Sequence, residues 1–310
     1  MRTEARVERD RVVAVPADPR QTMLRASEIL SWLLVALMAA STIMMLVVNE
    51  LLVAESSWAR EAFRGGELVS LVLGVPLLVG ALIAMRRGSI RAQALWIGML
   101  LYAAYNYAYA VFGSTFNDAF LVHIGAFSAS IFALACAMPA LDYGRIATAF
   151  GTVKTAKAIG IFLMAVGVGQ GLLWLFILVR NAITGEVLHD IPVNGQHLVF
   201  ALDLALLVPS LILSGILLAR RRPFGYLFGA AMAVMGTVYQ LNLMIAGVYG
   251  AAADVPGAKA FPLESVVLTT AFTVVASLMM LTGRYGTAHD RRLRHRRRTF
   301  DDSSFRSLRD

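Results

Sequence analysis

The polar side chains that could bind a ligand or carry a proton lie inside long apolar stretches of the sequence. Asp203 stands within LVFALDLALLVPSLILSGILLA, residues 198–219. A carboxylate costs a few kcal/mol or more in hydrocarbon, so we expect Asp203 to face the interior of a helix bundle with a partner or water. Two interpretations remain open: Asp203 contacts a substrate or carries a proton, or it only hydrogen-bonds neighbouring helices.

A stripe of phenols and one amide occurs in an earlier apolar stretch. Tyr102, Tyr105, Asn106 and Tyr109 recur at steps of three and four, which places them along one helix face, whereas Tyr107 points elsewhere. Such a stripe lines a polar cavity, bonds to a buried amide, or anchors the helix at the membrane interface. The depth of Tyr102 and Tyr105 argues against pure anchoring.

Further polar residues lie at a similar depth in other stretches. At about 1.5 Å per residue, Gln240 and Asn242 lie about 10–14 Å inside the outer end of their helix, and Glu50 lies near the outer end of the first one. With Tyr105, Tyr109, Asn106 and Asp203, they form the predicted site for an unidentified small molecule.

His123 is the only histidine within an apolar stretch. A lone histidine of this kind is typically a hydrogen-bonded core residue. The alternative is a metal ligand or proton relay together with Asp203, Glu50 or Glu264, because imidazole and carboxylate groups suit both tasks. The loop at 181–197 adds histidines in no recognised metal-binding spacing. We include His123 in the predicted site and predict no metal.

The sequence lacks the residues that several classes of membrane protein and enzyme require. None of the three lysines lies in the interior of a predicted span: Lys154 and Lys259 are in loops, and Lys157 is the first residue of a span. This argues against a retinal Schiff base. A single intramembrane histidine cannot ligate a bis-histidine haem. Protease, hydrolase and nucleotide-binding motifs are absent. Cys136 is the single cysteine, so no intramolecular disulfide or thiolate zinc site is expected, and we predict no cofactor.

These residues must be positioned by membrane helices. The chain has 310 residues, of which 58% are apolar and 15% charged, with a mean hydropathy of +0.68, outside the range of soluble globular proteins. The apolar runs are long enough to cross a bilayer as helices. We predict an all-α, polytopic integral membrane protein with eight transmembrane helices, at about 27–54, 67–85, 92–113, 117–140, 157–180, 198–219, 224–249 and 262–283.

The positive charges predict the orientation. With the N-terminus inside, cytoplasmic segments hold 24 of the 28 cations and outer loops hold four. Both termini are therefore expected in the cytoplasm, and the short loops suit a bacterial inner membrane.

The tail carries an arginine cluster that would contact anionic lipid headgroups, at about 1 kcal/mol per charge. The alternative is a strong orientation signal without a ligand, and nucleic-acid binding is not expected. The cluster comprises Arg291, Arg292, Arg294, Arg296, Arg297 and Arg298.

Two parts of the chain share one order of features. A proline, an arginine pair, and a tyrosine followed by a side-chain amide recur about 133 residues apart, from Pro76 and from Pro209. In this register Ser70 corresponds to Asp203. An offset of four helices predicts parallel repeats, and coincidence is the alternative. The resulting divisions are a polar segment at 1–26, a four-helix repeat at 27–140, a connector at 141–156, a second repeat at 157–283 and a basic tail at 284–310.

Three functions are compatible with this pattern. The first is a small-solute transporter or ligand-binding receptor with its site in the outer half, in which Pro76 and Pro209 create hinges. The second is a structural or partner-binding subunit, in which polar groups only join helices. The third is an intramembrane enzyme that uses His123 and Asp203 on a lipid-linked substrate, which requires these two side chains within hydrogen-bond reach. Gly167 and Gly171 allow close helix approach, within the bundle or between copies.

Overall fold

The computed structural model describes residues 18–48, 56–150, 154–185 and 193–281. Within these ranges the regular secondary structure is all helical, with no strand, and eight helices are long and apolar enough to span a membrane. The helices are α1 (Pro19–Val47), α2 (Ser57–Val69), α3 (Val75–Arg86), α4 (Ile90–Gly113), α5 (Phe120–Ala140), α6 (Tyr143–Phe150), α7 (Ala156–Thr184), α8 (Val193–Leu202), α9 (Val208–Ala219), α10 (Pro223–Ala252) and α11 (Leu263–Leu281). The prediction of an all-α integral membrane protein is confirmed at this level.

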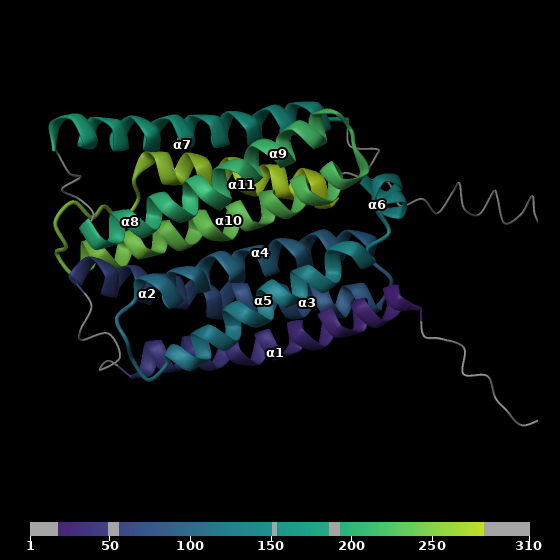
Figure 1. Cartoon of the computed structure of the whole chain (residues 1–310), viewed down its shortest axis with the longest axis horizontal. Helices are drawn as coiled ribbons and strands as arrows, with labels where there is room; N and C mark the ends of the chain where they lie inside the picture. Colours follow the sequence, from purple (N-terminus) through teal and green to yellow (C-terminus); the bar gives the residue numbers. More distant parts are fainter. Residues whose placement is uncertain (1–17, 49–55, 151–153, 186–192, 282–310) are drawn as a thin grey trace, which may run out of the picture.

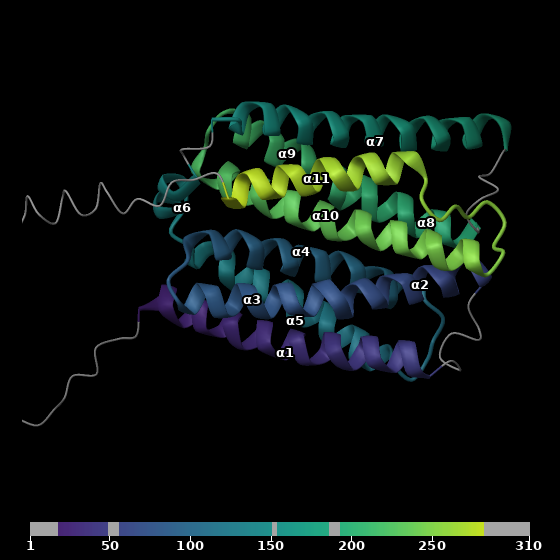
Figure 2. The same cartoon turned by 180° about the vertical axis from the view of Figure 1, so that it is seen from behind.

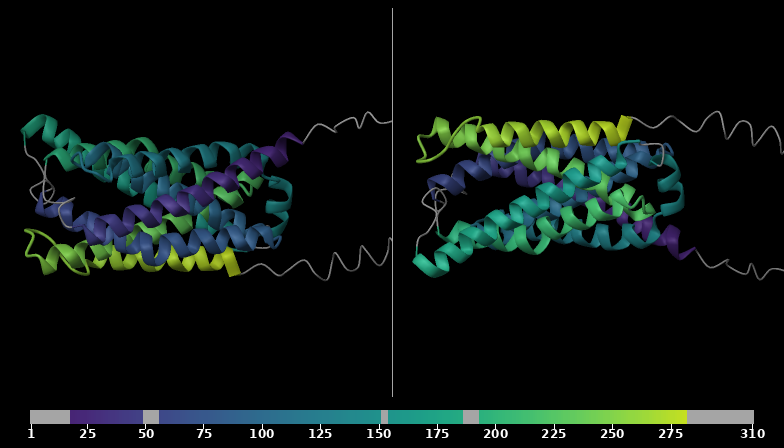
Figure 3. Two further views of the ribbon diagram at one scale, coloured as in Figure 1. Left: turned by 90° about the horizontal axis from the view of Figure 1, so that it is seen from below. Right: turned by 90° about the horizontal axis from the view of Figure 1, so that it is seen from above.

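The helices form two groups that lie side by side (Figure 1). Helices α1 to α5 make one group and α7 to α11 the other, with α10 packed against both α2 and α4. Figure 2 shows α11 along α10, and α7 at the far edge of the second group. The beginning of α1 and the end of α11 lie at the same end of the bundle (Figure 3), as an even number of spans requires. Which membrane side this end faces remains a prediction.

Two spans contain a wide helical turn that ends two residues before a proline. α2 continues into α3 through a π-helical turn, η3 (Ser70–Gly74), and α8 continues into α9 through η4 (Asp203–Leu207). Proline has no amide proton, and its ring clashes with the carbonyl four residues earlier, so the helix widens there. The two prolines that we expected to create hinges therefore follow wide turns within continuous helices, and Ser70 and Asp203 are the first residues of those turns.

The match between these two spans extends beyond the prolines. α3 and α9 each have 12 residues. Both are followed by a residue with positive φ, Gly88 at 85° and Arg221 at 53°, which stand 133 positions apart. In this register Tyr105 corresponds to Val238, so the tyrosine–amide pairs lie one residue out of step. The packing also differs between the groups, because α1 lies mainly on α5 whereas α7 lies mainly on α9.

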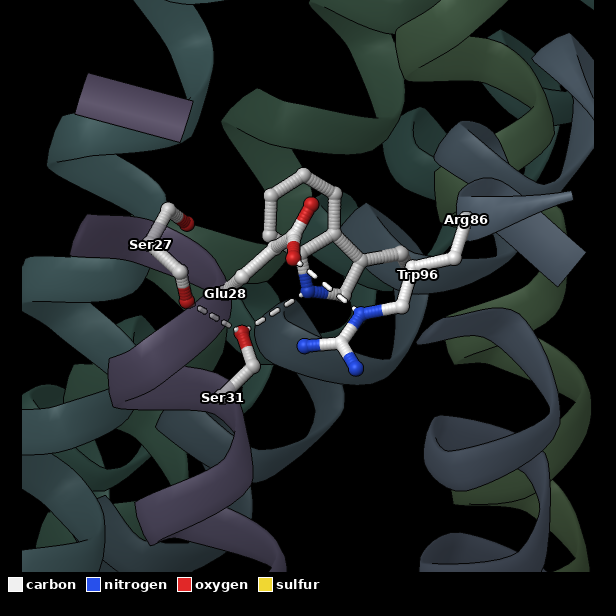
Figure 4. Close-up of polar contacts among 5 residues, drawn as sticks. All are labelled: Ser27, Glu28, Ser31, Arg86 and Trp96. Atoms are coloured by element: carbon white, nitrogen blue, oxygen red, sulfur yellow. Dashed lines mark hydrogen bonds and ion pairs between the residues drawn. The ribbon is translucent and has the colours of Figure 1, made fainter. Parts of the chain in front are cut away.

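Polar contacts join the helices near the end that carries the termini (Figure 4). The Trp96 indole donates to the Ser31 hydroxyl at 2.8 Å, and that hydroxyl donates to the Ser27 carbonyl at 2.7 Å. Glu28 forms an ion pair with Arg86 at 3.3 Å. These contacts fix α1 against α3 and α4, far from the carboxylate in η4.

Close helix contacts depend on glycines. A Cβ at Gly167 would lie 2.9 Å from the Leu211 Cβ, and one at Gly171 would lie 3.0 Å from the Val208 Cγ1. Both glycines therefore pack α7 against α9 within the chain. A Cβ at Gly65 would lie 2.5 Å from the Ala246 backbone, so α2 and α10 also approach closely.

The helix boundaries differ from the predicted ones most clearly in the second span. We expected this span to begin at residue 67, but the helix begins at Ser57, where the Ser56 hydroxyl accepts a hydrogen bond from the Ala59 amide. Its first turns carry charged side chains, among them Glu61 and Arg64, and so do not form an apolar run. Hydropathy alone therefore placed the start ten residues too late.

Candidate functional site

Asp203 is the centre of a hydrogen-bonded group inside the bundle. Its side chain is 1% exposed. One carboxylate oxygen, Oδ2, accepts hydrogen bonds from the Gln170 Nε2 and the Trp174 Nε1, each at 2.7 Å, and the other accepts one from the Tyr105 hydroxyl. Gln170 and Trp174 are one turn apart on α7, and Tyr105 is on α4, so the carboxylate joins helices from both groups.

Aromatic rings surround this carboxylate. Tyr105 lies edge-on to Tyr109 and to Tyr239, with ring centroids 5.3 and 5.2 Å apart, and the Tyr105 and Tyr109 hydroxyls are 3.2 Å apart. On the other side, the Trp174 ring lies 4.9 Å from that of Phe200. Tyr105 and Tyr109 of the predicted α4 stripe therefore lie in the Asp203 group, together with Tyr239 of α10.

The three donors to Asp203 are neutral side chains. Both ion pairs within the described part of the chain lie elsewhere, at Arg64–Glu61 and Arg86–Glu28. Hydrogen bonds to neutral donors stabilise a carboxylate, but they do not neutralise its charge. A proton or a positively charged ligand would do so, and the π faces of nearby rings favour a cation as well.

A second polar group is centred on Tyr102. Its hydroxyl lies 2.9 Å from the Ser70 Oγ, so the first residue of each wide turn is hydrogen-bonded to a tyrosine of α4. Asn242 of α10 donates to the Asn106 side-chain oxygen at 3.1 Å. The predicted amides thus meet across the contact between the two groups. Gln240 is also buried in α10, but it makes no hydrogen bond to Asp203.

The remaining predicted site residues lie elsewhere. His123 is fully buried in α5, and neither of its nitrogens has a hydrogen-bond partner within the described residues. The pairing with Asp203 that an acid–base enzyme would require is therefore not formed. No group of three or more His, Cys, Asp or Glu side chains in the described ranges is arranged to hold a metal ion. Glu50 and the six tail arginines lie outside the described residues.

Sequence reasoning missed two residues of the Asp203 group and one buried carboxylate elsewhere in the bundle. Gln170 and Trp174 stand four residues apart on one face of α7, a spacing visible in the sequence, but a single tryptophan in an apolar helix gave no reason to select it. Glu67 is the first residue of the predicted span, but in the structure it lies more than two turns inside the helix and is 3% exposed. A helix start at the Ser56 N-cap would have revealed it as a buried carboxylate.

No protein family model matches the chain, and no curated protein or solved structure matches it either. The chemistry of the site therefore has to be inferred from its own residues. Those residues are a buried carboxylate, three neutral donors and a set of aromatic rings, within a chain that eight apolar helices assign to a membrane.

Proposed function

We propose that the protein is a small-solute transporter, or a ligand-binding membrane receptor, with its site at Asp203. The observation that supports this most is the setting of that carboxylate, which is buried among aromatic rings and bonded only to neutral donors. A small organic cation matches both features, because a positive charge compensates the carboxylate and interacts favourably with the rings. Asp203 would bind the cation, or the coupling proton when no solute is present.

The position of Asp203 in its span suits access from one side. It lies seven residues after Gln196, where the apolar span begins, which is about 10 Å at about 1.5 Å per residue. The helix that holds Gln196, α8, lies toward the end of the bundle opposite the two termini (Figure 1). The amides Asn106, Gln240 and Asn242 lie on α4 and α10 near the same end and would supply hydrogen bonds to the polar part of a solute.

The membrane setting is part of the same proposal. The backbone match between α3 and α9, and between the wide turns that precede them, supports a parallel four-plus-four repeat. The first helices of the two repeats pack differently, α1 mainly on α5 and α7 mainly on α9. Such a difference is compatible with a transporter in which one repeat moves against the other during alternating access. The charge distribution supports a bacterial inner membrane with both termini in the cytoplasm, and the basic tail would contact anionic lipids there.

A structural or partner-binding subunit is the second candidate. It is favoured by one observation, which is that both oxygens of Asp203 already have partners within the protein. In that case the carboxylate only attaches α7 to α4. The two functions differ in their predictions for Asp203→Asn, since a structural role lowers stability without changing any response to a ligand.

A ligand-dependent thermal shift separates the two candidates. Wild type and Asp203→Asn would be compared in detergent with tetramethylammonium, guanidinium and choline, and with 3,3-dimethyl-1-butanol as a neutral analogue of choline. We expect at least one cation to raise the unfolding midpoint of the wild type in a saturable way, while the neutral analogue does not. The variant should show no shift, and uptake into proteoliposomes would follow for any cation that binds.

Glu264→Gln is the matched control for loss of a negative charge. Glu264 is exposed at the beginning of α11, so this variant should keep the full response of the wild type. Equal shifts in wild type and Asp203→Asn would contradict the proposal. Absence of any shift, with a less stable Asp203→Asn protein, would favour the structural subunit.

A further inference from the structure

A second set of buried polar side chains lies inside the first helix group, apart from Asp203. It consists of Ser41, Glu67, Tyr107 and His123, which come from α1, α2, α4 and α5. Each is at most 3% exposed. Five of their polar atoms have no hydrogen-bond partner within the described residues: the Ser41 Oγ, the Glu67 Oε2, the Tyr107 hydroxyl and both His123 nitrogens.

These four side chains are neighbours. Ser41 lies close to both the Glu67 carboxylate and the Tyr107 phenol, although neither contact has hydrogen-bond geometry. Tyr107 is near enough to interact with the charge of Glu67, and its ring centroid lies 6.0 Å from that of His123. The unpartnered atoms therefore belong to one region, to which four helices each contribute one residue.

Leaving these atoms without partners would be costly. A buried polar group with no hydrogen bond destabilises a protein by about 1–3 kcal/mol, and an uncompensated carboxylate costs more. Neither ion pair in the described part of the chain includes Glu67. An arrangement of one carboxylate and two hydroxyl oxygens is the usual environment of a hard cation rather than a soft one.

We propose that Ser41, Glu67 and Tyr107 bind a monovalent cation, either a sodium ion or a hydrated proton. A single charge is favoured because the site offers one carboxylate, so a divalent ion would leave a net charge in the membrane. The His123 ring lies beside the Tyr107 ring, with centroids 6.0 Å apart, and is not required as a ligand of the cation. Transition metals are disfavoured, since no set of three strong metal ligands occurs in the described ranges.

The surroundings of Glu67 contain few other titratable groups. Tyr102 and Tyr107 of α4 lie within electrostatic range of Glu67, whereas α1 contributes the non-titrating Ser41. From α10, Asn242 lies beside Gly66, where a Cβ would come within 2.9 Å of its side-chain oxygen. Tyr102 also approaches Asn242 and bonds to Ser70, so α4 carries contacts to the Glu67 region and to Asp203. The inference itself does not depend on a ligand at Asp203.

Thermal unfolding of the full-length protein in detergent tests this proposal. The midpoint would be measured in N-methylglucamine chloride with increasing sodium chloride at constant ionic strength, with potassium as the size control, and across pH without sodium. A sodium site gives a saturable rise with sodium that exceeds the rise with potassium. A proton site instead gives a rise on acidification in sodium-free buffer. Glu67→Gln should abolish a sodium-dependent rise, and Asp203→Asn should retain it. Protonation of Asp203 would contribute to an acid-dependent rise, so for a proton site Glu67→Gln should abolish the part of that rise that Asp203→Asn retains.

Tyr107→Phe keeps the test conclusive if Glu67→Gln does not fold. Loss of one ligand should weaken the apparent cation affinity about tenfold, and Ser41→Ala should act in the same direction. In cation-free buffer, Tyr107→Phe should be at least as stable as wild type, because it removes an unpartnered hydroxyl. The proposal is wrong if neither sodium nor acid stabilises the wild type more than the Glu67 or Tyr107 variant. Loss of the sodium response in Asp203→Asn would also contradict the proposal, because the cation would then depend on Asp203.

Discussion

Replacing Trp174 with phenylalanine removes one hydrogen bond to the Asp203 carboxylate and leaves an aromatic ring in its place. The bond is short, 2.7 Å from the Trp174 Nε1 to the Asp203 Oδ2. Hydrogen bonds to charged groups contribute about 1.5–3 kcal/mol in soluble proteins, but polar side-chain contacts measured in a membrane protein average about 0.6 and reach about 1.7. Gln170 continues to donate to the same oxygen, so we expect a loss of about 1 kcal/mol.

The matched control is Trp32→Phe. The Trp32 indole nitrogen is buried but has no hydrogen-bond partner among the described residues, so this variant loses no hydrogen bond. The Arg86 guanidinium lies 5.6 Å from the centre of the Trp32 ring, and a phenylalanine keeps an aromatic ring there. Both variants would be unfolded in mixed micelles with increasing dodecyl sulfate, followed by circular dichroism. Trp174→Phe should lower the free energy of unfolding by about 1 kcal/mol, and Trp32→Phe should leave it unchanged or raise it.

A double-mutant cycle isolates the contact. In the Asp203→Asn background, Trp174→Phe should cost clearly less than in the wild type, because the charged acceptor has already been removed. Equal costs in the two backgrounds, or equal costs for Trp174→Phe and Trp32→Phe, would refute the hydrogen-bonded carboxylate described here.

Other predictions concern the packing of the bundle. Gly65→Ala should destabilise the protein by about 1–3 kcal/mol, because the new Cβ would lie 2.5 Å from the Ala246 backbone, and thermal unfolding should show it. Gly169→Ala, with open space at that position, should be neutral or up to about 1 kcal/mol stabilising, and a loss there would contradict the orientation of α7. Arg91→Gln should cost about 1–3 kcal/mol, because the guanidinium donates to main-chain carbonyls at the ends of α6 and α11. An unchanged midpoint for Arg91→Gln would exclude that contact.

The sequence was sufficient for much of the architecture. Continuous apolar runs predict helices that span a membrane, and these occur in the structure. Spacing along one helix correctly placed Tyr105 and Tyr109 together, and the cost of a charge in hydrocarbon correctly placed Asp203 inside the bundle. Such arguments succeed because they concern one helix at a time, where periodicity determines which side chains share a face.

Contacts between helices were harder to predict. Nothing in the sequence of α7 indicates that Trp174, rather than a histidine or glutamate, would meet Asp203, because this depends on how α7 lies on α9. Sequence depth suggested that His123 lies near Asp203; in the structure its ring lies beside that of Tyr107, and it makes no hydrogen bond to Asp203. Glu67 was missed for a local reason, since the charged first turns of α2 concealed the beginning of the helix.

Fluorine NMR of protein labelled with 5-fluorotryptophan tests the role of Asp203 most directly. The chain contains four tryptophans, and Trp174→Phe identifies the signal of the one that bonds to Asp203. On titration with a stabilising organic cation, we expect the Trp174 signal to move in a saturable way while the other three remain in place. In Asp203→Asn the same titration should move none of them. A cation that binds without moving the Trp174 signal, or moves it equally in the variant, would contradict a ligand site at Asp203.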